Sequence, residues 1–183
     1  MDSDSDSMHS AVTRDDTTPL TESEWLSMQK RIARLVGKAS ASNVALVADQ
    51  ILAENIVAAR GFFCQTLIKL QSESPDSTDV HAALAAIINS RFPQVGHLLV
   101  KRAVLQFKAA HGRRDRDRMQ TASAFLAQLV NQRVVYEHLA LNVLMLLLSS
   151  DDDVEVAASF CAQCGALLLD VVRDKLKEIL AES

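Results

Sequence analysis

The chain has 183 residues, of which 49% are apolar but only 4% aromatic, with five glycines and three prolines. Leu and Ala dominate, which favours helices over strands, because strands are enriched in β-branched and aromatic residues. The net charge of −4 gives no sign of a generally basic, nucleic-acid-binding surface. The longest apolar run, Val143–Leu148, is far shorter than the ~20 residues that cross a bilayer, so we expect no membrane-spanning helix.

Residues 1–18 carry the whole net charge, with five aspartates against Arg14. This Asp- and Ser-rich run lacks the apolar side chains that would offset the entropy cost of ordering. We therefore expect a disordered acidic tail at 1–18 and one domain at 19–183. The tail suits either a solubilising role or phosphorylation by an acidophilic kinase on Ser3, Ser5 and Ser7. With no secretory signal, the three cysteines indicate reduced thiols in the cytosol or nucleus.

From Thr21 onward, apolar residues recur at helical spacing. Thr21-x-x-Glu24 is a capping-box pattern, and this first helix is expected to end near Gly37. Ser42–Asn43 is expected to cap the second helix, and the third is expected to start after Asn55 and to end at the Ser72–Pro75 break. Thr78 or Asp79 is expected to cap the fourth helix, Pro93 to lie in the first turn of the fifth, and Asp115 or Asp117 to start the sixth. The last three helices are predicted over about 135–148, 152–168 and 171–181. The buried stripe of the second helix is predicted to be Val44, Leu46, Val47, Ile51 and Leu52.

Alternate predicted helices begin near residues 22, 57, 93, 134 and 171, so the pattern repeats about every 35–41 residues. A helix pair of this length cannot bury its own apolar face, and successive pairs stack into one continuous core. The sequence therefore predicts an all-α, HEAT-like solenoid of helical hairpins, with about four repeats and eight to nine helices. The eighth helix, with Ala157, Phe160, Cys161 and Leu167, is apolar on more than one side, which predicts an interior position.

No pattern in the chain predicts catalysis, a metal or a cofactor. Cys161-x-x-Cys164 has metal or redox spacing, but it lies within a predicted helix and lacks a second pair, which favours packing thiols. The glycines are too far apart for a phosphate loop. Asp151–Asp153 precedes a helix, where negative charge opposes the helix dipole. Surface or capping positions are expected for the scattered histidines His81, His97, His111 and His138. We therefore expect a non-enzymatic protein.

Two surface segments remain as candidate binding sites. One is the turn Gly37–Asn43, and the other is the basic segment Lys101–Arg118. In a solenoid the turns between helices line up along an edge, which is where repeat proteins bind partners, so the two segments are expected on one edge. A solvated turn without a partner is the plain alternative for the basic segment. Its seven cations are Lys101, Arg102, Lys108, Arg113, Arg114, Arg116 and Arg118.

Several stretches in order give the chain a family resemblance: ILAENIVAARG at 51–61, LQSESP at 70–75, HAALAAIINSRFPQVGHLLVKR at 81–102, LAQLVNQRVVYEHLAL at 126–141 and DDDVEVAASFCAQCG at 151–165. From about Trp25 to Gly165 the chain resembles the middle domain of translation initiation factor 4G, in the form found in the Cwc-twenty-two, or nucampholin, family of pre-mRNA-splicing factors. The resemblance implies a nuclear splicing adaptor, with shuttling to the cytoplasm, that joins other spliceosome components. It would bind the DEAD-box RNA helicase of the exon junction complex, which is of the initiation-factor-4A type, hold its two RecA-like lobes apart and restrain its ATPase.

The resemblance also implies contact residues. A partner-contact motif in the family's first turn, approximately Asn-Lys-Val-Asn-x-Ser-Asn, matches this chain at Lys38, Ser42 and Asn43, whereas Gly37 and Ser40 replace asparagines. Weaker contacts are expected from Arg113 and Arg114, and the opposite edge around Phe92-Pro93 and Gln132-Arg133 is the alternative surface. A scaffold on the cytoplasmic helicase in translation is a second hypothesis. Direct RNA binding through the basic segment is a third, ranked last because the body is neutral and aromatics are few.

Overall fold

The computed structural model describes residues 21–181, so the predicted tail with Ser3, Ser5 and Ser7 lies outside the described residues. Within the described range the protein is all-α, as predicted, with eight α-helices and two short 3₁₀ turns. The α-helices are α1 Glu22–Gly37, α2 Val44–Leu52, α3 Ile56–Glu73, α4 Thr78–Arg91, α5 Pro93–Gly112, α6 Arg116–Asn131, α7 Glu137–Leu147 and α8 Val154–Ala181, and the 3₁₀ turns are η1 Pro75–Ser77 and η2 Asp151–Asp153.

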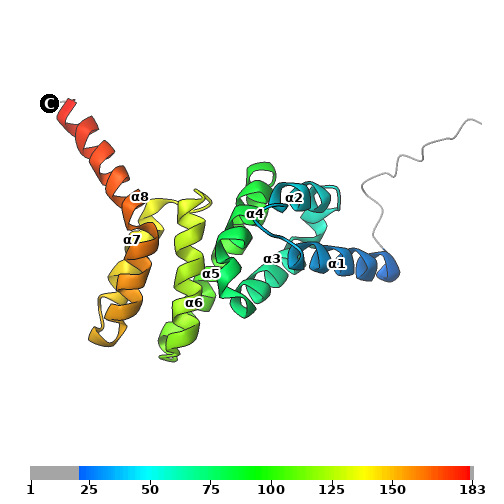
Figure 1. Ribbon diagram of the computed structural model, residues 1–183, viewed down its shortest axis with the longest axis horizontal. Coiled ribbons are helices and arrows are strands. Elements are labelled where there is room, and N and C mark those ends of the chain that lie inside the picture. The colour runs from blue at the N-terminus through cyan, green and yellow to red at the C-terminus, as the bar shows by residue number, and fades with distance from the viewer. Residues whose placement is uncertain (1–20, 182–183) are drawn as a thin grey trace, which may run out of the picture.

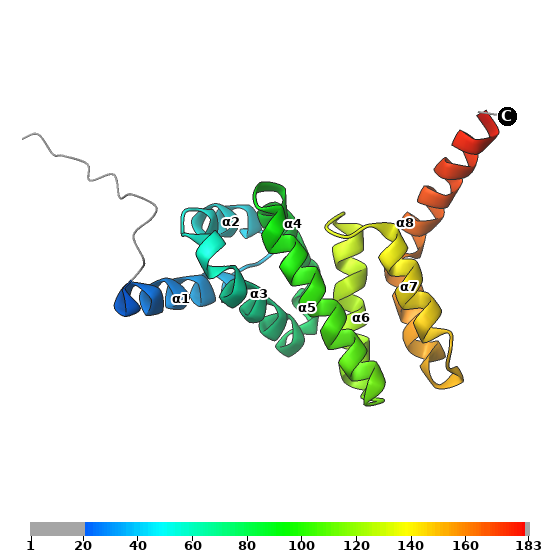
Figure 2. The same cartoon turned by 180° about the vertical axis from the view of Figure 1, so that it is seen from behind.

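The helices follow one another along the long axis of the molecule, with α1 near one end and α8 at the other (Figure 1). The α4–α5 and α6–α7 turns lie along the upper edge, and the α5–α6 and α7–α8 turns lie along the lower edge. The view from behind shows the same arrangement (Figure 2). This is the predicted HEAT-like solenoid, in which each helix pair packs on its neighbours.

Most of the predicted helix starts are confirmed in atomic detail. The Thr21 hydroxyl accepts from the Glu24 N–H at 3.3 Å while the Glu24 carboxylate accepts from the Thr21 N–H at 3.1 Å, which completes the capping box. Asp115 caps α6 by accepting from the Arg118 N–H, and Pro93 occupies the first turn of α5. The cap predicted for α4 was wrong. Ser77 holds the N-cap position, because the Thr78 hydroxyl donates to the Pro75 carbonyl instead.

The core is continuous along the solenoid and contains four fully buried phenylalanines from α3, α5, α6 and α8, namely Phe63, Phe107, Phe125 and Phe160. Each buried ring contributes about 1.5–3 kcal/mol of hydrophobic stabilisation. Two cysteines share this core, and burial raises the pKa of the Cys64 and Cys164 thiols to about 11. Cys161 is exposed instead of packed, so the prediction for the Cys161-x-x-Cys164 pair holds for one member only.

Other predictions about packing were also wrong. The expected break between 168 and 171 is absent, and α8 runs through it, because no Gly or Pro interrupts the segment and Asp170 pairs with Arg173 on the surface instead of capping a new helix. Nor is α8 interior within the described part of the chain: Phe160 lies in the core, but Leu169 is 68% exposed on the opposite side. Leu46 of α2, predicted to be buried, is 61% exposed.

One helical segment of the described chain, Asp151–Val171, is long enough and apolar enough to cross a membrane, judged by length and composition alone. No such segment was expected from the sequence. One face of this segment is buried in the protein core, through Val156, Ala157, Phe160 and Cys164. Only 28% of the segment is buried within the described structure, so packing against the neighbouring helices accounts for only part of its apolar content.

Gly96 of α5 is required by its close approach to α4. A Cβ atom at position 96 would lie 1.9 Å from Asn89 Oδ1 and 2.9 Å from Asn89 Cβ. We therefore expect Gly96→Ala to lower the free energy of unfolding by about 1–3 kcal/mol, because overpacking outweighs the better helix propensity of alanine. Urea unfolding followed by far-UV circular dichroism measures the change.

Gly112→Ala is the matched control, since no atom lies within 4 Å of a Cβ at this position in the last turn of the same helix. It should leave stability unchanged or raise it by up to about 1 kcal/mol. Equal losses for the two variants would show that the contact with Asn89 is not what constrains Gly96.

His81 of α4 was expected at a surface or capping position but is buried, and its Nδ1 has no hydrogen-bond partner. Burial lowers the pKa of His81 below its usual 6.5, although the Ser77 backbone and the Asp79 carboxylate act in the opposite direction. Below about pH 6.5 the unfolded chain therefore takes up a proton that the folded protein resists, and stability falls as the pH is lowered.

We expect His81→Gln to reduce the loss of unfolding free energy between about pH 7.5 and 5.5, because the variant lacks the titrating group. Urea unfolding at several pH values tests this. The same substitution at the exposed His97 provides the control. A pH dependence that is identical in the wild-type protein and in the His81 variant would contradict the assignment.

Candidate partner-binding surfaces

The turn between α1 and α2 is closed by the side chain of Asn43. Its Oδ1 accepts from the Ser40 N–H at 2.8 Å, and its Nδ2 donates to the Lys38 carbonyl at 3.0 Å. Asn43 occupies the N-cap position of α2, as predicted, but its side chain makes no capping hydrogen bond there. Both ends of the amide are used within the turn, so Asn43 fixes the backbone conformation that presents its neighbours.

Lys38 and Ser42 are exposed polar members of this turn, in which Gly37 and Ala41 are exposed as well. The Ser42 hydroxyl lies 3.0 Å from the Ser40 hydroxyl, whereas the Lys38 ammonium makes no ion pair with any residue that the structure describes. Lys38 extends a row of exposed cations that begins on α1, and we call Lys30, Arg34 and Lys38 the α1 basic stripe. Their spacing of four residues places them on one face of the helix.

Sequence reasoning missed Lys30 and Arg34, although their spacing from Lys38 was the available signal. Arg31, which lies between them in sequence, has a different role. Its guanidinium forms two hydrogen bonds with the Glu54 carboxylate, at 2.6 and 2.7 Å, which fasten α1 to the turn between α2 and α3. The same hydrogen bonds lower the pKa of Glu54. The α1 basic stripe is therefore carried by a helix whose position is fixed.

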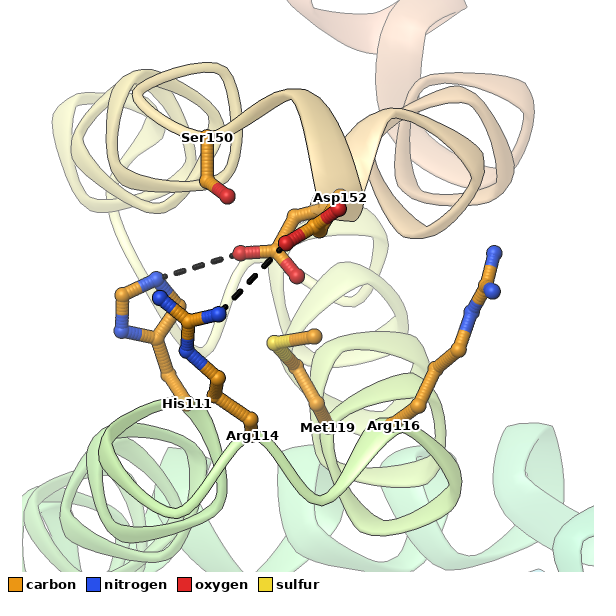
Figure 3. A pocket seen from close by; sticks show the side chains of 7 residues that line it. His111, Arg114, Arg116, Met119, Ser150 and Asp152 are labelled. Carbon is orange, nitrogen blue, oxygen red and sulfur yellow. Dashed lines mark ion pairs between the residues drawn. The ribbon is translucent and has the colours of Figure 1, made fainter.

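The second predicted segment, around Arg113 and Arg114, packs against the turn between α7 and α8 (Figure 3). His111 Nε2 lies 3.3 Å from Asp153 Oδ2, and Arg114 Nη1 lies 3.6 Å from Asp152 Oδ2. A further ion pair joins Arg116 to Glu155. We call these residues the charged cluster: His111, Arg114, Arg116, Asp152, Asp153 and Glu155.

The charged cluster shows that the α5–α6 turn and the α7–α8 turn contact each other, so neither is a simple solvated turn. The acidic run Asp151–Asp153 precedes α8, as predicted, but Asp152 also pairs with Arg114 of the preceding repeat and Asp153 contacts the His111 imidazole. Among the predicted contact residues, Arg113 is exposed and makes no ion pair within the described chain, whereas Arg114 is paired. The carboxylates of the α7–α8 turn therefore lower the net positive charge around the basic turn.

Arg114 also holds an unusual backbone conformation, with φ 55°, at the end of α5. The Asp115 N–H donates to the Ala110 carbonyl at 3.0 Å, the closure that normally places a glycine at this position. Arg133 at the end of α6 has the same conformation, with φ 56°, and the Val134 N–H donates to the Leu129 carbonyl at 3.0 Å, so two helix ends of the described chain share this left-handed closure. The conformation directs the Arg114 side chain toward the α7–α8 turn (Figure 3).

The structure does not bring the two predicted sites together. In both views the α5–α6 and α7–α8 turns lie at the lower edge, whereas the α1–α2 turn lies higher, beside α4 (Figures 1 and 2). The α1 basic stripe and the charged cluster are therefore separate surfaces. The alternative residues Phe92-Pro93 and Gln132-Arg133 belong to the α4–α5 and α6–α7 turns, along the upper edge.

A solenoid of helix pairs that presents charged turns belongs to the class of helical-repeat binding proteins. The MIF4G domain family matches residues 29–183, so the chain belongs to this family. This result confirms the resemblance to the middle domain of initiation factor 4G.

The chain is similar to several curated proteins. It is 41% identical over 168 residues to the pre-mRNA-splicing factor CWC22 homolog of Caenorhabditis elegans, which covers 87% of this chain and 19% of that protein. Identity to the human CWC22 homolog is 40% over 96% of this chain and 20% of that protein. The male determiner protein Mdmd(III) of Musca domestica is 45% identical over 82% of this chain and 13% of its own length. The chain thus spans a fifth or less of these relatives.

The geometry of the α1–α2 turn predicts different roles for two of its matched residues. Asn43→Ala removes both hydrogen bonds that close the turn and should lower the free energy of unfolding by about 1–2 kcal/mol. Ser42→Ala removes only a contact between two hydroxyls and should change it by less than about 0.5 kcal/mol. Thermal unfolding of the two variants measures both effects, and equal values would mean that the Asn43 amide does not fix the turn.

Proposed function

We propose that this chain is a non-enzymatic adaptor for pre-mRNA splicing that binds a DEAD-box RNA helicase of the initiation-factor-4A type and acts in the nucleus. The observation that carries the proposal is the similarity over 87–96% of the chain to splicing factors of two species.

The α1 basic stripe is the surface that we assign to the helicase. Its exposed cations make no ion pair with any described residue, so binding an acidic partner would not first require an internal pair to be broken. The turn that carries Lys38 is fixed by Asn43, and α1 is fixed by Arg31. Such pre-organisation lowers the entropy cost of association.

The adaptor would restrain the helicase ATPase if it bound the two lobes of the helicase while they are apart. A DEAD-box helicase turns over ATP when its two RecA-like lobes close on each other. A rigid solenoid that binds the lobes in their separated arrangement stabilises that arrangement, because a ligand shifts a conformational equilibrium by its difference in affinity for the two states. The adaptor would thus lower ATP turnover without contacting the nucleotide.

The alternative functions have weaker support. The two CWC22 homologs are named for splicing, which favours the splicing helicase over the cytoplasmic one as the partner. Direct RNA binding would rest on the basic segment, whose Arg114 and Arg116 are engaged by Asp152 and Glu155.

Isothermal titration of the purified chain with the exon-junction and the translational helicase tests the proposal, together with RNA-stimulated ATPase activity. Binding in the micromolar range or tighter, with a preference for the exon-junction helicase and a reduced ATPase rate, is the expected result. Absence of binding at micromolar concentration would reject the proposal. Tighter binding to the translational helicase would favour the scaffold hypothesis instead.

Lys38→Glu should weaken helicase binding by about 2–5 kcal/mol if the ion pair is desolvated at the interface. Folding should be retained, because Lys38 is exposed and its side chain makes no ion pair within the described chain. Lys30→Glu and Arg34→Glu should act in the same direction.

The matched control is Lys101→Glu, which reverses an exposed charge on α5, a different helix from the one that carries the stripe. Titration of each variant, with circular dichroism as the check on folding, separates the surfaces. A folded Lys38→Glu protein with full affinity would place the helicase elsewhere, beginning with the upper edge around Phe92 and Arg133.

A further inference from the structure

Ser150 lies in the α7–α8 turn, and its hydroxyl faces the charged cluster (Figure 3). Together with His111, Arg114 and Arg116 it lines a hollow of about 350 Å³ between this turn and the α5–α6 turn. The neighbouring Ser149 donates its hydroxyl hydrogen to the Leu146 carbonyl at 2.6 Å. Ser150 makes no side-chain hydrogen bond with any residue that the structure describes.

The sequence after Ser150 is Asp151-Asp152-Asp153, so acidic side chains occupy each of the three positions that follow the hydroxyl. Acidophilic serine/threonine kinases select serines in this setting, because basic groups in their substrate groove bind the carboxylates that follow the acceptor. Ser149, Asp151 and Asp152 are exposed and Ser150 is half-buried, so the segment lies at the surface.

We propose that Ser150 is a phosphorylation site for an acidophilic serine/threonine kinase, and that its phosphate is held by Arg114 and His111 of the preceding repeat. The kinase transfers the γ-phosphoryl group of ATP to Ser150 Oγ. The new bond joins Oγ to phosphorus, the bond between the γ-phosphorus and the bridging oxygen breaks, and ADP leaves. The hydroxyl proton passes to the catalytic base of the kinase.

The charged cluster supplies the groups that would hold this phosphate. A phosphoserine carries a charge of about −1.5 to −2 and three strong acceptor oxygens, and an arginine opposite it forms charge-assisted hydrogen bonds. The present partner of Arg114 is Asp152, at 3.6 Å, and both side chains are more than 80% exposed, so this ion pair is weak. Asp152 can turn into solvent when the phosphate takes its place.

Repulsion from the neighbouring aspartates opposes the phosphate. Two features reduce this repulsion: Arg114 points toward the site (Figure 3), and α8 begins at Val154, where the helix dipole favours negative charge. Arg116 lines the same hollow, but its guanidinium is paired with Glu155. Arg114 is therefore the cation that has the orientation to receive a phosphate on Ser150.

The same contacts control access by enzymes. A kinase or phosphatase binds its substrate segment extended, which requires the turn to open and the hydrogen bond from the Asp153 N–H to the Ser150 carbonyl, 3.2 Å long, to break. Once Ser150 is phosphorylated, the contacts of the phosphate with Arg114 add to this closure. Removing the Arg114 charge should therefore speed dephosphorylation at Ser150.

Incubation of the full chain with casein kinase 2 and ATP, followed by peptide mass spectrometry, tests the acceptor. Ser3, Ser5 and Ser7 have acidic neighbours in the same chain and serve as internal positive controls. We expect phosphate on Ser150, its selective loss in Ser150→Ala, and its retention in Ser149→Ala. Phosphorylation of the N-terminal serines with none on Ser150 would overturn the proposal.

Dephosphorylation by a non-specific phosphatase tests the receiving site. The phosphate on Ser150 should be released several-fold more slowly than those on the N-terminal serines, and Arg114→Gln should abolish this difference. Arg113→Gln is the matched control, since Arg113 is adjacent and exposed but makes no described ion pair. Equal release from Ser150 in the wild-type protein and in Arg114→Gln would show that Arg114 does not hold the phosphate. These readouts do not involve the helicase, so the inference stands apart from the proposed function.

Discussion

Burial of apolar surface between successive helix pairs is the constraint on which the structure depends. No pair among the described helices encloses its own apolar face, so Phe63, Phe107, Phe125 and Phe160 belong to one hydrophobic core that continues from repeat to repeat. Hydrophobic burial has no direction, and the register of the pairs is set by specific contacts. Examples are the approach of Gly96 to Asn89 and the two hydrogen bonds of Arg31 with Glu54.

Much of the fold could be predicted from the sequence, because its signals are local. The capping box at Thr21, Pro93 in a first turn and the period of about 40 residues depend on near neighbours in the chain. Two errors were local, namely the α4 cap and the break within α8, and the others arose where distant packing decides the outcome. Leu46 and Leu169 are apolar but have no described neighbour to cover them, and apolar periodicity alone cannot supply that information.

The candidate surfaces could be predicted only in part for a similar reason. Lys38 and Asn43 were identified from a family motif, but the motif did not reveal that the Asn43 amide is used inside the turn. The charged cluster was missed, because Arg116 and Glu155 are 39 residues apart. That separation equals about one repeat, so oppositely charged turns in consecutive repeats are the signal that would have indicated the pairing.

The one-sided packing of α8 has a consequence for how the molecule opens. In a linear array, each repeat is stabilised only by its neighbours, so a repeat with one described neighbour is held by half as many interfaces. Amide hydrogens along the outer part of α8, beyond Leu169, should exchange with solvent through local opening, while those of α5 and α6 exchange only on global unfolding. Fluctuations along this part of α8 can therefore occur without disturbing the core contacts that α5 and α6 make in the middle of the described chain.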